Sequence, residues 1–107
     1  MQKKESYYFL QSVPGIGNIT ITNLLTYFVH VEDILSAPEA ELKNILKPNQ
    51  LNMFLERRER EKYKEELKDI LRAGYQYISI EDREYPKRLL NIPDPPYGLF
   101  LKGELPP

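Results

Sequence analysis

The sequence predicts a mainly α-helical fold, a small domain of about five helices followed by a short β-containing extension. Three observations predict it. Apolar residues recur at helical spacing over residues 3–73, whereas residues 75–80 alternate and are rich in β-forming types. Proline and glycine stand where helices are expected to start or stop. The change of pattern at Ala73–Gly74 divides the chain into a helical domain over 1–73 and an extension over 74–107.

The first two helices are expected on either side of a glycine-containing turn. One runs from Lys3 to Ser12 and ends at the break Pro14-Gly15-Ile16-Gly17. Asn18 follows, and its side chain is suited to cap a second helix that ends near Phe28. The core positions expected from this second helix are Ile19, Leu24, Leu25 and Phe28.

Three further helices are expected before Gly74. A very short one spans 31–35, and the next starts at a capping box with Ser36 at the N-cap and Glu39 three residues on, and ends near Leu46. Pro48 suits the first turn of a long helix over about 49–73, which Gly74 closes in the left-handed conformation. The buried stripe expected along this helix is Leu51, Phe54, Leu55, Tyr63, Leu67, Ile70 and Leu71.

After Gly74 the pattern predicts two strands and the turns between them. Residues 75–80 form the first strand, 81–84 a polar turn, 86–90 a helical turn and 99–102 the second strand. If no larger sheet receives them, the two strands either pair with each other or keep open edges, and open edges favour self-association.

Composition narrows the classes of function. Fifteen basic and sixteen acidic residues leave a net charge of −1, which argues against a strongly cationic nucleic-acid binder. The chain has no cysteine and one histidine, His30, which leaves little material for a metal site or a histidine-based triad. We therefore expect no metal, no cofactor and no enzymatic activity. No apolar run approaches the roughly 20 residues of a membrane span, and we expect a cytoplasmic protein without a membrane partner.

The turn between the first two helices resembles a helix-hairpin-helix motif, in which two glycines flank an apolar residue. The glycines permit a tight turn, and amides at the start of the second helix are able to donate to a phosphate. The candidate nucleic-acid contacts are Gly15, Ile16, Gly17, Asn18 and Thr20, with Lys3 and Lys4 nearby. No cation follows the second glycine, so a structural hairpin that only holds the two helices together is favoured over a phosphate contact.

Other groups of polar and aromatic side chains have a structural and a functional interpretation. The charge run 56–66 is typical of a solvated helix face, and a nucleic-acid ridge is the alternative. Eight tyrosines and four phenylalanines are candidates for core packing or for stacking on single-stranded bases. The carboxylates Glu81, Asp82, Glu84 and Asp94 are not expected to act in acid–base catalysis or metal binding, and turn-forming hydrogen bonds are expected for Asp82 and Asp94.

The last quarter of the chain carries the most specific pattern. Its members are Tyr85, Pro86, Leu89, Ile92, Asp94, Pro95, Pro96, Leu99, Phe100, Lys102 and Gly103. This stretch resembles the segment that opens the core domain of the DNA-processing DprA (Smf) family. The resemblance continues over nearly the whole chain in the order of that family, from Val13-Pro14-Gly15-Ile16-Gly17 through the Ser-Ala-Pro-Glu helix start and the long charged helix.

The resemblance implies a fold and a role. The helical domain would be the sterile-alpha-motif-like (SAM-like) or helix-hairpin-helix domain of the family, and the strands would begin a Rossmann-like domain, so that residues 1–107 would be an N-terminal fragment. Members of this family bind single-stranded DNA and load the RecA recombinase onto it during natural transformation, the competence-dependent uptake and recombination of DNA. The single-strand groove and main dimer surface of the family lie beyond residue 107. The resemblance therefore implies a non-catalytic accessory module with at most weak DNA contact. The alternative is a protein-interaction domain that docks a regulator or a second copy.

Overall fold

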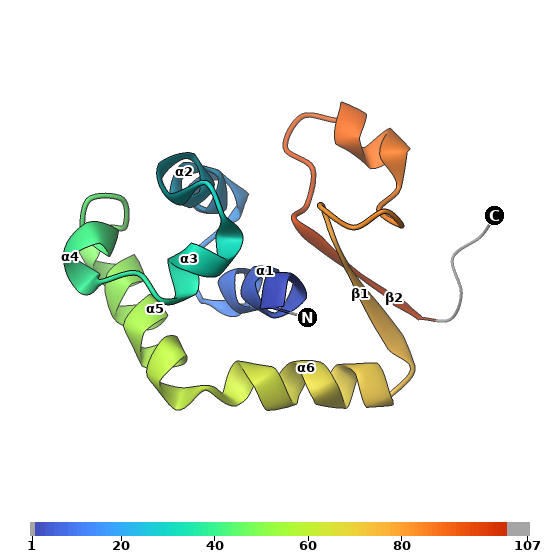
Figure 1. Cartoon of the computed structure of the whole chain (residues 1–107), viewed down its shortest axis with the longest axis horizontal. Helices are drawn as coiled ribbons and strands as arrows, with labels where there is room; N and C mark the ends of the chain where they lie inside the picture. The colour runs from blue at the N-terminus through green and yellow to red at the C-terminus, as the bar shows by residue number, and fades with distance from the viewer. Residues whose placement is uncertain (1, 103–107) are drawn as a thin grey trace.

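A computed structural model describes residues 2–102 of the chain (Figure 1). Over this range it contains six α-helices, a short 3-10 helix and a two-stranded antiparallel sheet. The elements are α1 (Gln2–Ser12), α2 (Asn18–Phe28), α3 (Val31–Leu35), α4 (Glu39–Leu42), α5 (Pro48–Arg60), α6 (Lys62–Arg72), β1 (Tyr75–Ser79), η1 (Lys87–Asn91) and β2 (Gly98–Lys102). The expected mainly helical fold with a β-containing extension is confirmed, with six helices in place of about five. Gly103 of the C-terminal motif lies outside the described residues.

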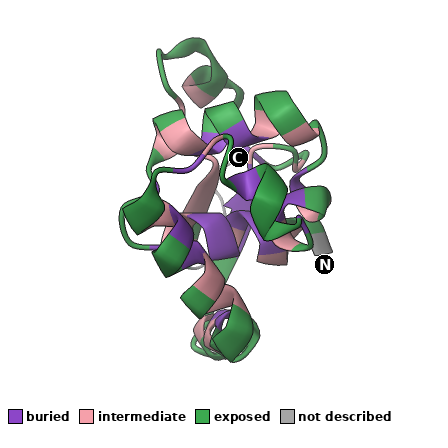
Figure 2. Cartoon of the chain, turned by 90° about the vertical axis from the view of Figure 1, so that its left-hand side faces the viewer, coloured by how far each residue is buried: buried purple, intermediate pink, exposed green. Residues whose placement is uncertain are grey.

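Helix α1 lies in the middle of the fold, with α2 to α5 on one side and α6 and the sheet on the other (Figure 1). Its sequence explains this position, because the consecutive residues Tyr7, Tyr8, Phe9 and Leu10 cover most of the circumference of the helix with apolar surface. Phe9 and Leu10 are fully buried. Figure 2 shows buried residues on the inner faces of the surrounding helices and exposed residues on the outside. One core cluster therefore joins the helices to Tyr77 of β1.

Helix α2 has the expected bounds, but two expectations about it are wrong. The N-cap is Gly17, and Asn18 is the first helical residue and does not cap the helix with its side chain. Ile19 is 74% exposed, whereas Ile21 is 1% exposed. The buried face passes through Ile21 and Leu24, with the half-buried Leu25 and Phe28 beside it. Positions 21, 24, 25 and 28 share one helix face, and a residue two places before 21 points away from it.

The capping box predicted before α4 does not form. The N-cap of α4 is Pro38, without a side-chain cap, and the helix ends at Leu42 rather than near Leu46. The Ser36 hydroxyl instead donates to the Asp33 carbonyl at 3.5 Å, at the C-terminal end of α3. The Ser36 hydroxyl, which the sequence pattern assigned to the start of α4, therefore binds the end of α3 instead.

The long helix predicted over 49–73 is broken into α5 and α6. Glu61 separates them in the left-handed conformation, with φ of 54°. Pro48 begins α5 and Gly74 follows α6 with φ of 95°, as expected. The predicted stripe is confirmed, with Leu51, Phe54, Tyr63 and Leu67 buried and Leu55, Ile70 and Leu71 half-buried.

Packing on α1 explains the break. Phe54 of α5 and Tyr63 of α6 both contact the Phe9 ring, with ring centroids 5.0 and 4.9 Å away. In a straight helix two residues nine apart point in opposite directions and are separated by about 13.5 Å along the axis. Both rings reach Phe9 only because the helix turns at Glu61.

Strands β1 and β2 pair with each other, from Tyr75 opposite Lys102 to Ser79 opposite Gly98. The turn after β1 is closed by Asp82, whose carboxylate accepts a hydrogen bond from the Ser79 amide at 2.7 Å, as expected for a turn aspartate. Each strand pairs along one side only within residues 2–102. None of the helices in that range is long and apolar enough to cross a membrane.

Candidate functional site

The hairpin turn between α1 and α2 needs one of its two glycines for its own geometry. Gly15 has φ of 85°, a conformation that favours glycine, and Ile16 beside it is only 6% exposed and holds the turn against the core. Gly17 has φ of −104°, and a Cβ added there would meet nothing within 4 Å. The backbone turn therefore explains Gly15 but does not require Gly17.

The Asp-Pro-Pro motif lies across the start of α2. We call residues Asp94–Tyr97 the strap. The Asn18 side-chain amide donates to the Pro95 carbonyl at 2.9 Å and to an Asp94 carboxylate oxygen at 3.1 Å. One turn further along α2, the Thr22 and Tyr97 hydroxyls lie 2.6 Å apart. The two segments that the sequence analysis singled out, the hairpin and the proline motif, therefore bind each other.

The strap also has anchors outside α2. The buried Tyr85 donates its hydroxyl to the Pro96 carbonyl at 2.6 Å. The Tyr97 ring stacks on Tyr7 of α1, with centroids 6.0 Å apart. Asp94 itself has φ of 60°, a left-handed conformation that aspartate tolerates better than most residues. The two tyrosines that flank the motif thus fix its turns.

The other described residues of the C-terminal motif lie in or beside η1 and in β2. Pro86 is the N-cap of η1, and Ile92 ends η1 with 44% of its surface exposed. Phe100 is 45% exposed and meets the Tyr8 ring edge-on. The Lys102 ammonium lies 5.5 Å from the centre of the Tyr75 ring. The half-buried members are Pro86, Leu89 and Leu99.

Lys3 and Lys4 both face carboxylates from the turn after β1. The Lys3 ammonium lies 3.1 Å from Glu81, and the Lys4 ammonium lies 3.6 Å from Asp82. Tyr7 donates its hydroxyl to Glu81 at 2.5 Å, and this bond, followed by that of Lys3, lowers the pKa of the Glu81 carboxyl. Glu84 lies exposed in the same turn. Two of the four acids and both hairpin lysines are thus paired within the chain.

The side chains of Asn18 and Thr20, two of the candidate nucleic-acid contacts at the hairpin, have partners in the chain. Besides Asn18, the Thr20 hydroxyl accepts a hydrogen bond from the Gln50 side chain at 3.2 Å, and Gln50 also donates to the Gly15 carbonyl at 3.0 Å. The Asp94 carboxylate, held by Asn18, places a negative charge beside the first turn of α2. That charge opposes the approach of a phosphate to the amino end of the helix. These contacts favour the structural interpretation of the hairpin.

The outward face of α2 is a second candidate surface, which the sequence analysis missed. Ile19 and Tyr27 of α2 are exposed by 74 and 48%, and Val29, directly after the helix, by 70%. No residue of α2 is charged, although 29% of the chain is. One hollow of about 460 Å³ is lined by Ile19, Thr22, Asn23, Asp94, Pro95 and Tyr97. Another of about 430 Å³ is lined by Asn23, Thr26, Tyr27, Asn44 and Ile45.

The signal that would have found this face is the lack of charge in α2 together with more apolar residues than one buried stripe needs. The backbone is also strained directly after α2, at Val29. Val29 has φ of 71°, which is unusual for a β-branched residue, and the His30 amide donates to the Phe28 carbonyl at 2.8 Å. His30 itself is the exposed N-cap residue of α3. Of the aromatic residues considered for base stacking, Tyr27 is exposed here, whereas Tyr7 and Phe54 are buried.

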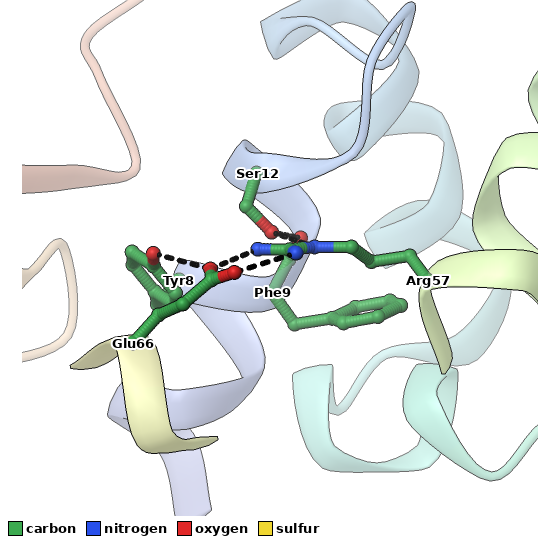
Figure 3. Close-up of polar contacts among 5 residues, drawn as sticks. All are labelled: Tyr8, Phe9, Ser12, Arg57 and Glu66. Atoms are coloured by element: carbon green, nitrogen blue, oxygen red, sulfur yellow. Dashed lines mark hydrogen bonds and ion pairs between the residues drawn. The ribbon is translucent and has the colours of Figure 1, made fainter. Parts of the chain in front are cut away.

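Two members of the charge run, Arg57 and Glu66, bind each other in the polar cluster of Figure 3. Arg57 of α5 makes a two-pronged ion pair with Glu66 of α6, in which Nη1 and Oε2 are 2.9 Å apart. Arg57 also donates to the Ser12 hydroxyl at 3.0 Å, and Tyr8 donates to Glu66 at 2.9 Å. Burial and the bond to Glu66 raise the pKa of Tyr8 to about 12. The cluster joins α1, α5 and α6.

Comparisons of the chain with protein-family models, with curated proteins and with solved structures find no match.

Replacing Asn18 with alanine is expected to release the strap from α2. The loss of two side-chain hydrogen bonds should lower the free energy of unfolding by about 1 kcal/mol. Amide hydrogen exchange should accelerate at Ile80, whose amide donates to the Tyr97 carbonyl of the strap at 2.9 Å, while the core amides of α1 keep their protection. Asn23→Ala, an exposed asparagine on the same helix, is the matched control. Equal exchange rates in both variants would show that Asn18 does not hold the strap.

Proposed function

We propose that the chain is an accessory module of a DNA-processing protein of the DprA (Smf) kind, a protein that binds single-stranded DNA and loads RecA. The observation that carries the proposal is the contact between the two segments on which the resemblance depends. Asn18, at the place where a DNA-binding hairpin commonly carries a cation, instead binds the strap at Asp94 and Pro95. The hairpin then provides the binding surface for the proline motif, and this contact joins the helical domain and the extension into one unit.

The module itself makes at most weak contact with DNA. Lys3 and Lys4 are paired with carboxylates, so their binding to phosphate would require those ion pairs to break. Few counterions would be released, and counterion release supplies most of the affinity of sequence-independent binding. We assign the module no catalytic role, because the polar side chains of the hairpin and strap bind each other.

Docking of a protein partner is the second candidate function. The outward face of α2 supports it, because the exposed apolar side chains of Ile19 and Tyr27 lie on an uncharged helix beside two hollows, and Val29 is exposed directly after that helix. An exposed apolar patch of this kind is typical of protein–protein contact. A regulator or a second copy of the chain would be the partner.

Fluorescence anisotropy with a labelled single-stranded oligonucleotide tests the proposal. At physiological salt the chain is expected to bind with a dissociation constant weaker than about 10 µM, in the range of non-specific contacts. The charge-reversal variant Lys3→Glu/Lys4→Glu separates the two functions: it abolishes residual binding if the hairpin contacts DNA and leaves partner docking unchanged.

Two controls make the result specific. Lys43→Gln/Lys87→Gln removes two exposed lysines away from the hairpin, and it should leave any hairpin contact in place. Circular dichroism of the Lys3/Lys4 variant excludes unfolding as the cause of a loss. Sub-micromolar binding by the unmodified chain would contradict the proposed weak contact.

A further inference from the structure

The break between α5 and α6 has no local cause in the sequence. Residues 49–73 contain neither glycine nor proline, and the residues around Glu61 are mostly strong helix formers. Glu61 nevertheless has φ of 54° and ψ of 13°, a left-handed conformation that side chains other than glycine rarely adopt. Local preference thus favours one continuous helix through this residue.

Contacts made by side chains on both sides of Glu61, and not by Glu61 itself, hold the break in place. Phe9 packs between Phe54 and Tyr63, and Arg57 binds Glu66 across the break (Figure 3). Both pairs are nine residues apart, a separation of about 13.5 Å in a straight helix, so neither arrangement exists within a continuous helix of one chain.

The break divides the described chain into a body, residues 2–60, and an arm, residues 62–102. In Figure 1 the arm leads away from α5 and passes around α1. Besides the Arg57–Glu66 pair with α5, it makes polar contacts with α1 and α2: Glu66 accepts from Tyr8 at 2.9 Å, Tyr77 donates to Gln11 at 2.5 Å, and Pro95 accepts from Asn18 at 2.9 Å. The arm and the body are therefore joined in sequence at one strained residue and in space by many contacts.

We propose that two copies of this chain exchange their arms. In the exchanged dimer Glu61 becomes helical, α5 and α6 form one continuous helix, and each arm packs on α1 and α2 of the other copy. Every contact between arm and body forms again between the copies, including the Phe9–Tyr63 and Arg57–Glu66 pairs. Relative to two monomers, the dimer gains helical hydrogen bonds, and both copies of Glu61 leave the left-handed conformation. The opposing cost is the entropy of association.

Light scattering after size-exclusion chromatography, over a range of concentrations, measures the exchange. Glu61→Gly should weaken dimerisation by about a hundred-fold, because glycine accepts the left-handed conformation and disfavours the helix at both hinges. Glu61→Ala should strengthen it by about five-fold through its higher helix propensity. Glu59→Ala, an exposed glutamate within α5, is the matched control and should leave the dimerisation constant within about two-fold of the natural value.

A labelling experiment distinguishes arm exchange from pairing of open strand edges. In a dimer mixed from isotope-labelled and unlabelled chains, the nuclear Overhauser effects between the Phe9 and Tyr63 rings should connect different copies. A dimer in which these effects stay within one copy would overturn the proposal. A Glu61→Ala variant that stays monomeric up to a protein concentration of about 1 mM would also overturn the proposal. This concentration is the upper end of the range in which such association is tested.

Discussion

Replacing Phe9 with alanine is expected to lower the free energy of unfolding by about 4 kcal/mol, the cost of removing a fully buried phenylalanine. The Phe9 ring lies edge-on to Phe54 and Tyr63, with ring centroids 5.0 and 4.9 Å away. Because these rings come from α5 and α6, which the break at Glu61 sets at an angle, the cavity cannot close by the movement of one helix. Urea denaturation followed by circular dichroism measures the loss.

Tyr27→Ala is the control for that experiment. Tyr27 is 48% exposed on α2, and its removal should cost less than about 1 kcal/mol. A loss at Phe9 no larger than the loss at Tyr27 would contradict the central position of α1. Since domains of this size are stable by only about 5–15 kcal/mol, the substitution is expected to remove a large share of the free energy of unfolding.

Replacing Arg57 with methionine is expected to cost about 2 kcal/mol. The Arg57 side chain is 20% exposed and Glu66 is 39% exposed, so the pair lies between a buried ion pair, which costs several kcal/mol to break, and a surface pair, which costs little. Methionine keeps the aliphatic length but leaves Glu66 and the Ser12 hydroxyl without the guanidinium. Arg60→Met is the matched control, because Arg60 is 60% exposed and pairs with Glu56 on the same helix.

The pH dependence of stability distinguishes the ion pair from simple packing. The bond to Arg57, followed by that from Tyr8, lowers the pKa of the Glu66 carboxyl below its ordinary value of 4.5. A group whose pKa is lowered by folding contributes stability above its unfolded pKa and loses it as the pH falls through its folded pKa. The natural chain should therefore lose this contribution below about pH 4.5, and Arg57→Met should show a shallower acid loss. Parallel acid profiles for the two proteins would assign the effect of Arg57 to packing alone.

Local signals in the sequence predicted where most elements begin and end. Pro48 starts α5 and Gly74 ends α6, because each has a backbone preference that acts within one turn. The alternation over 75–80 and the run ending at Lys102 predicted two strands, which pair with each other. The glycine at position 15 predicted a tight turn, and it has the positive φ that glycine accepts.

The candidate site was predicted in its residues but not in its arrangement. The hairpin and the Asp-Pro-Pro motif were both singled out, yet nothing in either segment indicates that Asn18 binds Asp94 and Pro95, 76 and 77 residues away. Asn18 was assigned to the cap of α2 because asparagine favours that position, but Gly17 takes it and the side chain is free to reach the strap. The exposed face of α2 was missed because Ile19 is a large apolar residue, a type that is expected to be buried in a core.

The sequence by itself determined that the chain is mainly helical, where most of its helices and its two strands lie, and that a turn at Gly15 and a proline motif separate them, because these features follow from preferences that act over a few residues. Only the tertiary structure decided which face of α2 is buried, that the strap lies on the hairpin, and that the helix predicted over 49–73 turns at Glu61. These outcomes depend on residues far apart in the chain. The packing of Phe54 and Tyr63 on Phe9 outweighs the local preference of Glu61 for a helix, since burying large aromatic side chains stabilises the fold by more than one left-handed residue costs.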